Sequence, residues 1–281
     1  MPGTLYVVAT PIGNLEDVTL RALRVLRSVS VIAAEDTRRS SRLLQHYSIS
    51  TPTTSLHEHN EHKKTPSLIR QLLGGESIAL VSDAGTPVIS DPGARLIAEA
   101  HAAGLRVEPI PGPSALMAAL SASGFAGDTF VFLGFPPARA TQRLKWLADV
   151  AAERRTLVLY EAPHRIRETL SDMLTVFGDR TVALGRELTK AHEELVVRPI
   201  SRHLQSMSEP KGEYTLVVAP LSSEAGAPRE VPDAPTMLAE FCHLTDNEAV
   251  SRRSAIKQLA VKYGLSARDV YARVEEARDS G

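Results

Sequence analysis

The sequence predicts an α/β protein with two α/β domains, a cleft between them and a small helical appendage at the carboxyl terminus. Three observations predict this class. The first ~110 residues alternate short β-branched runs with helical patterns, which indicates parallel βα units. Later strands follow one another without full-length helices between them, which indicates a mixed sheet. Residues 237–278 are helical in pattern throughout.

In the first half, apolar runs predict the strands and helical spacing predicts the helices. Leu20, Leu23 and Leu26 share one face of the first expected helix. Glycines close two later helices, at Gly74 and at Gly104. The expected strands are residues 5–9, 31–34, 78–81 and 105–109, and the expected helices are residues 19–29, 41–47, 65–73 and 94–103.

In the second half, Pro111-Gly112-Pro113 is the expected hinge, and an alanine-rich helix follows Ser114 up to about Ser123. The strands expected beyond it are residues 130–133, 156–160, 181–184, 194–198 and 214–219, with helices at 141–152 and 165–177. The polar, proline-bearing stretch 222–235 predicts a linker. The expected domains are therefore residues 1–112 and 113–221, then the linker and a helical tail, 236–281.

Composition predicts a cytoplasmic protein that lacks membrane spans. The formal net charge of −1 gives no global basic signature, so contact with nucleic acid has to depend on local patches. The single cysteine, Cys242, excludes an internal disulfide and any cysteine-rich zinc site. No apolar run approaches the ~18 residues that a transmembrane helix needs, and no secretory leader is visible.

Loops rich in glycine, proline and polar residues follow five of the predicted strands. The most informative is LVSDAGTPVISDPG, residues 80–93, and the others are residues 10–15, 35–39, 111–115 and 161–165. Open α/β sheets bind their ligands at the carboxyl ends of strands. One such loop alone would be an ordinary turn, but five at one edge predict a binding cleft.

The motifs support neither a classical dinucleotide or P-loop phosphate site nor a metal site. The chain has neither a GxGxxG fingerprint nor a GxxxxGK[ST] phosphate loop. His57 and His59 would share a face of an extended segment while His62 points away, and no fourth ligand has matching spacing. We therefore expect no metal site, and a polar loop that lines the cleft instead.

A set of motifs in a fixed order carries a family resemblance. TPIGNL, AEDTR, SLHEHNE, SDAGTPVISDPG, IPGPSA, FLGF, LYEAPHR and GEYTLVV span residues 4 to about 220. In this order and spacing they resemble the tetrapyrrole-methylase superfamily, most of all its branch of 16S rRNA cytidine-2′-O-methyltransferases. A helical tail is also typical of that branch.

The resemblance implies an S-adenosylmethionine enzyme that holds its cofactor in the cleft between two α/β domains. It also implies cofactor contacts from both halves of the chain. The positions carried over are Pro11, Ile12, Gly85, Thr86, Val88, Ser90, Ser114, Ala115, Tyr160, Arg186 and Thr215. Glycines at such positions allow close approach of the backbone to a ligand. Homodimerisation is common in this superfamily and is expected here on that ground alone.

Methylation of a ribose hydroxyl needs alignment of donor and acceptor, and a nearby base assists it. The candidates for the base are Glu35, Glu58, Glu161 and His164, with Asp36 and Glu187 as further titratable residues on the cleft loops, and Lys190 is the candidate for stabilising a developing alkoxide electrostatically. Spacing does not distinguish among them, and each is also explained as a cap, an ion pair or a solvated side chain. Asp83 and Asp91 are expected to brace their loop.

Local clusters of basic residues are the expected RNA contacts. They are Arg38, Arg39, Arg42, Arg139, Arg143, Arg252, Arg253 and Lys257. Residues 254–263 and 267–276, joined by Gly264-Leu265-Ser266, have the form of a helix-turn-helix. This tail either docks on the ribosomal subunit or packs as a helical hairpin or dimer contact, and the sequence leaves both open.

The expected function is 2′-O-methylation of a cytidine in the decoding centre of 16S rRNA, with the small ribosomal subunit as partner. Methylation of a tetrapyrrole or another small molecule is the alternative within the superfamily. A non-catalytic RNA-binding or ribosome-assembly module is the alternative from another class. Binding of S-adenosylmethionine distinguishes the last from the first two.

Overall fold

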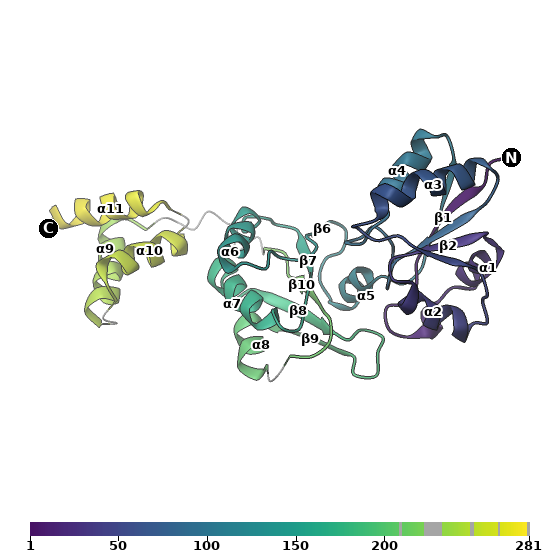
Figure 1. Ribbon diagram of the computed structural model, residues 1–281. Coiled ribbons are helices and arrows are strands. Elements are labelled where there is room, and N and C mark those ends of the chain that lie inside the picture. Colours follow the sequence, from purple (N-terminus) through teal and green to yellow (C-terminus); the bar gives the residue numbers. More distant parts are fainter. Residues whose placement is uncertain (208–209, 222–231, 248–249, 264, 280–281) are drawn as a thin grey trace. The chain divides into compact units, whose positions relative to one another are not determined.

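The computed structural model describes residues 1–207, 210–221, 232–247, 250–263 and 265–279. The chain forms two compact units, Met1–Pro220 and Leu221–Gly281 (Figure 1). The first contains two sheets flanked by helices and the second is helical, which confirms the expected α/β class with a helical appendage. Most of the expected linker, residues 222–231, and Gly264 of the expected turn lie outside the described residues. The expected boundary at 112–113 stays a prediction.

The first sheet is parallel throughout and has the strand order β3-β2-β4-β1-β5. Its strands are β1 Thr4–Val8, β2 Val31–Ala34, β3 Thr53–Ser55, β4 Ile78–Val81 and β5 Arg106–Ile110. Helices α1 Leu20–Ser28, α2 Thr37–His46, α3 Glu61–Leu73 and α4 Ala94–Ala102 alternate with them, and a short 3₁₀ helix covers Leu15–Asp17. Side chains alternate between two apolar clusters, because α1 and α2 cover one face while α3 and α4 cover the other.

Two helices of this sheet begin earlier than the apolar pattern predicts. Helix α2 begins at Thr37 because the Asp36 side chain accepts a hydrogen bond from the backbone N–H of Arg38 at 2.9 Å. Helix α3 begins at Glu61 and continues through Pro66, which was expected in its first turn. Strand β3 was not expected, since TTS carries no apolar residue.

The second sheet is mixed, as expected, with the order β6-β7-β10-β8-β9. Its strands are β6 Phe130–Phe132, β7 Thr156–Glu161, β8 Thr181–Arg186, β9 Glu194–Pro199 and β10 Tyr214–Val218; only the β6–β7 pair is parallel. Helix α5 Ala115–Ala122 packs on one face through Leu116, Ala119 and Leu120. Helices α6 Ala140–Asp149, α7 Ile166–Phe177 and α8 Ile200–Ser206 supply the core of the other face. Helix α8 was not expected from the sequence.

The second unit contains α9 Ala234–Cys242, a π-helical turn His243–Asn247, α10 Arg252–Tyr263 and α11 Ala267–Asp279. Asp233 caps α9 by accepting from the N–H of Thr236 at 3.0 Å. Met237, Phe241, Ala255, Leu259, Val270 and Val274 form its buried core. No helix among the described residues has the length and apolar character that crossing a membrane requires.

Candidate active site

A cavity of the first unit with a volume of about 460 Å³ lies where the carboxyl ends of β1, β2, β4, β7 and β8 and the first residues of β10 come together. Loops after β1, β2 and β4 line it from the first sheet, and residues from β7, β10 and the loop after β8 line it from the second. The volume falls within the ~300–1,000 Å³ that small-molecule sites occupy. This placement agrees with the edge at which the sequence predicts a cleft.

The loop after β4 reaches the cavity through a tightly specified backbone. Thr10 and Gly85 exchange two backbone hydrogen bonds of 2.8 and 2.9 Å, which join the loops that follow β1 and β4. Gly85 has a φ of 78°, and a Cβ there would lie 3.3 Å from Cγ2 of Ile12. Val88 and Ser90 also have positive φ, 75° and 67°, a conformation rarely adopted by a β-branched residue. Such strained backbone is concentrated at functional sites, and here it shapes the cavity wall.

An aromatic wall faces this loop from the second sheet. The ring of Tyr160 lies 5.0 Å from that of Phe132 and 5.5 Å from that of Phe135, measured between centroids. Its hydroxyl accepts a hydrogen bond from the backbone N–H of Leu116 at 3.2 Å. Burial raises the pKa of Tyr160, so its phenol stays protonated. Tyr160 and Phe135 both line the cavity, and their rings, tilted by 53° to each other, give it an aromatic wall with one polar hydroxyl.

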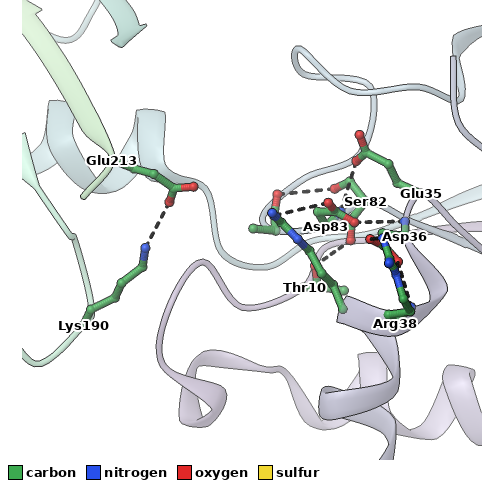
Figure 2. A network of polar contacts seen from close by, with 10 residues as sticks. Thr10, Glu35, Asp36, Arg38, Ser82, Asp83, Lys190 and Glu213 are labelled. Atoms are coloured by element: carbon green, nitrogen blue, oxygen red, sulfur yellow. Dashed lines mark hydrogen bonds and ion pairs between the residues drawn. The ribbon is translucent and has the colours of Figure 1, made fainter. Parts of the chain in front are cut away.

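Three carboxylates, Glu35, Asp83 and Asp91, line the side that belongs to the first sheet. The Glu35 carboxylate accepts from the N–H of Asp83 at 3.2 Å, and the Asp83 carboxylate accepts from the N–H of Asp36 at 3.0 Å (Figure 2). Arg39 forms an ion pair with Asp83 at 3.3 Å. These reciprocal bonds lock the loops after β2 and β4 to each other.

Desolvation within the cavity changes the acidity of this cluster. Burial is the largest cause that raises the pKa of Asp91 to about 6, and the nearby charges of Glu35 and Asp83 raise it further. A hydrogen bond from Ser82 opposes the shift. Burial also raises the pKa of Glu35 above its ordinary value, against a backbone hydrogen bond from Asp83. Asp91 is therefore a carboxylate that can gain and lose a proton close to neutral pH.

Lys190 closes the opposite side of the cavity. Its ammonium group lies 2.9 Å from a carboxylate oxygen of Glu187. It lies 3.0 Å from a carboxylate oxygen of Glu213 (Figure 2). Desolvation lowers its pKa, but the hydrogen bonds to Glu187 and Glu213 outweigh this effect and raise it. Lys190 is therefore a fixed positive charge that is neutralised by two acids.

The loop that carries Lys190 also contacts the loop after β1. The hydroxyl of Thr189 accepts from the N–H of Asn14 at 3.1 Å. A Cβ on Gly13 would lie 2.4 Å from Cγ of Lys190, so only glycine fits this approach. Glu187 and Thr189 both have positive φ. We call this contact of residues 13–14 with residues 189–190 the closing contact.

The structure brings eight of the expected cofactor residues to the cavity and leaves three outside its lining. Those that line it are Ile12, Gly85, Thr86, Ser90, Ser114, Ala115, Tyr160 and Thr215. Pro11, Val88 and Arg186 do not line it; Val88 packs against the core on the α3–α4 face, and Arg186 lines a separate cavity.

The expected catalytic residues separate in the same way. Glu35 and Lys190 line the cavity, whereas Glu58 and His164 are exposed and do not. Glu161 lines it but is 1% exposed, and its oxygens accept from Thr169 Oγ1 at 2.5 Å and from the N–H of Ala162 at 2.8 Å. With Arg165 3.4 Å away, Glu161 serves as a buried brace.

Sequence reasoning missed several residues of the cavity wall. Phe135, Leu188, Glu213 and Tyr214 line it, together with Ile89, Ala162 and Pro163. Phe135 belongs to the FLGF motif, and its place in that motif was the signal that could have found it. Glu213 and Leu188 carried none, because they reach the cavity only through the order of β8 and β10 in the sheet.

The expected RNA-contacting residues are exposed, with one exception. Arg38, Arg39, Arg42 and Arg139 lie on the surface of the first unit, and Arg252, Arg253 and Lys257 lie on that of the second. Arg143 is 1% exposed, because Asp172 at 2.7 Å and Glu168 at 3.4 Å hold it between α6 and α7. We therefore withdraw Arg143 from the RNA-contacting set.

Within the described ranges, no group of three or more His, Cys, Asp or Glu side chains is arranged to hold a metal ion. His57 and His59 contact each other edge to face, with ring centroids 6.0 Å apart. Asn60 fixes this loop by accepting from the N–H of His57 at 2.9 Å.

Several solved structures share this architecture. Uroporphyrin-III-C-methyltransferase from Thermus thermophilus matches with a TM-score of 0.55 and 22% identity over 80% of this chain and 97% of its own. Another structure of that enzyme, complexed with S-adenyl homocysteine, gives a TM-score of 0.56 at 17% identity, over 77% and 97% of the two chains. A diphthine synthase gives 0.62 at 13% identity, over 77% and 90%. At these identities the similarity shows the fold alone.

Sequence relatives are much more similar. A Synechocystis protein named ribosomal RNA small subunit methyltransferase I is 45% identical over 278 residues, which cover 96% of each chain. The protein of the same name from Pseudomonas aeruginosa is 52% identical over 222 residues, 77% of this chain and 79% of its own. The family model for tetrapyrrole (corrin/porphyrin) methylases matches residues 4–202. The chain therefore belongs to the tetrapyrrole methylase family.

Proposed function

We propose that this protein transfers the methyl group of S-adenosylmethionine to the RNA of the small ribosomal subunit. The observation that carries the proposal is the 45% identity, along 96% of both chains, to a relative named for methylating that RNA. The finer proposal is that the acceptor is the 2′-hydroxyl of a cytidine in the decoding centre of 16S rRNA. The finer proposal is supported by the ordered loop motifs and by a carboxylate in the cavity that suits a hydroxyl acceptor.

The residues of the candidate active site fit S-adenosylmethionine. Gly85 leaves a cradle beside Ile12 that a Cβ would fill, and Tyr160 and Phe135 each offer an aromatic ring against which an adenine packs. The carboxylates on the opposite side suit hydroxyl and ammonium groups. When bound, the cofactor supplies an electrophilic methyl group. We propose that Pro11, Val88 and Arg186 act on this site through the loops they support.

The remaining task of the protein is to hold the acceptor hydroxyl and to take its proton. We propose that Asp91 accepts this proton at a carboxylate oxygen, since burial, with a smaller contribution from the charges of Glu35 and Asp83, raises its pKa to about 6. Lys190 holds the cavity closed through Glu187 and Glu213. Glu58 and His164 lie outside this machinery.

RNA binding is proposed for the exposed cations Arg38, Arg39, Arg42, Arg139, Arg252, Arg253 and Lys257. Of these cations, Arg39 lines the candidate active site and pairs with Asp83. We therefore propose that Arg39 contacts the RNA at the site itself. We further propose that the protein is a homodimer and works in the cytoplasm, where small ribosomal subunits assemble.

Two measurements test the proposal. Calorimetry with S-adenosylmethionine should show binding at a single site, and no affinity would favour the non-catalytic RNA-binding module. Radiolabelled cofactor with small subunits that lack the modification should place the label in 16S rRNA. Label in a tetrapyrrole substrate but none in the RNA would favour the small-molecule alternative.

A further inference from the structure

A second cavity, of about 100 Å³, lies on the α8 side of the second sheet. Its volume is several times the ~10–15 Å³ that one water molecule requires. Strands β8 and β9, helix α8, Met207, Pro210 and the start of β10 line the cavity. The lining includes Arg186, Glu194, Arg198, His203 and Tyr214. Tyr214 also lines the candidate active site, so the two cavities are neighbours across the start of β10.

The sheet register brings two arginines to this cavity. Arg186 lies opposite Glu194, and Arg198 lies opposite Val182. The lining residues of these strands are Leu184 and Arg186 of β8 and Glu194, Val196 and Arg198 of β9. They occupy alternate positions, so their side chains share one face of the sheet. The two arginines are four register positions apart, and their long side chains reach the same cavity from its two ends. Two arginines thus line one small space, and among the described residues that line it Glu194 is the single carboxylate.

A buried histidine orients Arg198. The Nε of Arg198 donates to Nδ1 of His203 at 3.1 Å, so this ring nitrogen is the acceptor. The other ring nitrogen, Nε2, then carries the proton and donates to the carbonyl oxygen of Val182 at 2.9 Å. Burial lowers the pKa of His203, which is 1% exposed, so the ring stays neutral. Both Nη groups of Arg198 remain without a partner among the described residues.

Arg186 also lines this cavity and has a buried donor without a partner among the described residues. Its Nε is buried and finds no acceptor in the part of the chain that the structure describes. Its nearest carboxylate oxygen, on Glu194, lies 3.5 Å from Nη2, and the Glu194 side chain is 52% exposed. Buried donors in native proteins are nearly always paired, so an unpaired one indicates a missing acceptor.

We propose that this cavity binds a phosphate group in the backbone of the RNA substrate, between Arg186 and Arg198. This inference rests on the proposed function for the source of the phosphate. A phosphate offers several acceptor oxygens, and guanidinium forks match its geometry. A phosphate held here lies next to the candidate active site and orients the acceptor strand. Glu194 competes with it for Arg186, and His203 is a positioning residue that acts through Arg198.

The test compares the salt dependence of binding to a small-subunit RNA fragment. Arg198→Gln should weaken binding and reduce the slope of log K against log salt by about 1. Glu194→Gln removes the competing carboxylate and should tighten binding. Arg202→Gln is the matched control, because Arg202 is an exposed arginine on α8 that does not line the cavity. A slope for Arg198→Gln equal to that of the unchanged protein would overturn the proposal.

A binding measurement with inorganic phosphate distinguishes a free phosphate from an RNA backbone phosphate as the ligand of this cavity. If phosphate binds to the unchanged protein and not to Arg198→Gln, while the RNA slope is the same in both, the cavity serves a free phosphate and the RNA proposal fails. Arg198→Lys keeps the charge and should restore part of the slope, also where Arg198→Gln folds poorly. If Arg198→Gln reduces the salt slope of RNA binding but the unchanged protein methylates no rRNA, the phosphate site is supported and the proposed function is rejected.

Discussion

Asp91 differs from the other carboxylates of the cavity in having few protein donors to hold it ionised. Glu161 accepts two hydrogen bonds from its neighbours, and Asp83 accepts one and pairs with Arg39. For Asp91, desolvation outweighs the hydrogen bond from Ser82 and its pKa is raised to about 6. The sequence predicts Asp83 and Asp91 as braces of their loop, and the network supports that interpretation more for Asp83 than for Asp91.

Asp91→Asn removes the proposed base and keeps its size. We expect the methylation rate to fall by about 10²–10⁴-fold, the usual contribution of a general base. Calorimetry should show that S-adenosylmethionine still binds. Glu58→Gln is the control, because Glu58 is an exposed acid that does not line the cavity, and its rate should be unchanged. Equal rates for Asp91→Asn and the unchanged protein would exclude Asp91 as the base.

The pH dependence of methylation follows from the raised pKa of Asp91. Asp91 accepts a proton only when it is ionised, and with a pKa of about 6 it is ionised above that pH. The rate should therefore rise through about pH 6 and level off above it. A single-turnover pH profile measures this, and a profile that is flat from pH 5 to 8 would contradict it.

At the scale of elements, the site depends on loops from both sheets that meet in space. The sequence predicts the edge at which they gather, because glycine and proline mark loops after strands and parallel strands share one edge. It does not predict Glu213 or Leu188, whose position depends on β10 lying between β7 and β8. It places Arg143 wrongly, because burial of this side chain depends on acids of α7 far along the chain.

The closing contact should affect cofactor affinity. Gly13→Ala puts a Cβ within 2.4 Å of Lys190, and overpacking of this kind costs about 1–3 kcal/mol. We expect S-adenosylmethionine to bind about tenfold more weakly, as measured by calorimetry. Gly127→Ala is the matched control, since its Cβ would meet nothing closer than 3.9 Å. Equal affinities for the two variants would show that the contact does not help to hold the cofactor.

We expect Arg143, which lies between α6 and α7, to contribute to the stability of the fold and not to RNA binding. Arg143→Ala removes a buried side chain and leaves the Asp172 carboxylate, which is 20% exposed, without its partner at 2.7 Å; loss of a hydrogen bond between charged groups costs about 1.5–3 kcal/mol. Chemical denaturation measures this loss. The salt dependence of RNA binding should stay the same, and a reduced slope would restore Arg143 to the RNA-contacting set.

At the scale of the whole molecule, the chain joins a unit with a cavity suited to a small ligand to a helical unit with exposed cations. The fold class was predictable from alternation of strands and helices, and the helical tail from its uniform pattern. Within the tail, Arg252 lies 3.9 Å from Glu275 and over the ring of Phe241, so part of its charge is used internally. Among the side chains of α10 that the structure describes, Arg253 and Lys257 are further exposed cations, and they are the ones that the proposed RNA contact of the tail would use.

Arg253→Gln with Lys257→Gln should weaken binding to small-subunit RNA and reduce its salt slope by about 1–2, with unchanged affinity for S-adenosylmethionine. Filter binding over a salt series measures the slope. Arg278→Gln is the control, because this arginine of α11 pairs with Glu275. If the double variant and the control have the same slope, the tail has a packing role and the RNA contacts lie in the first unit.

The most direct test of the central claim locates the transferred methyl group. Small subunits that lack the modification are incubated with the protein and S-adenosylmethionine, and the 16S rRNA is digested and analysed by mass spectrometry. The account predicts one added methyl on the ribose of a cytidine in the decoding centre, made by the unchanged protein and strongly reduced with Asp91→Asn. A methyl group on a base, or no added methyl in the RNA, would contradict it.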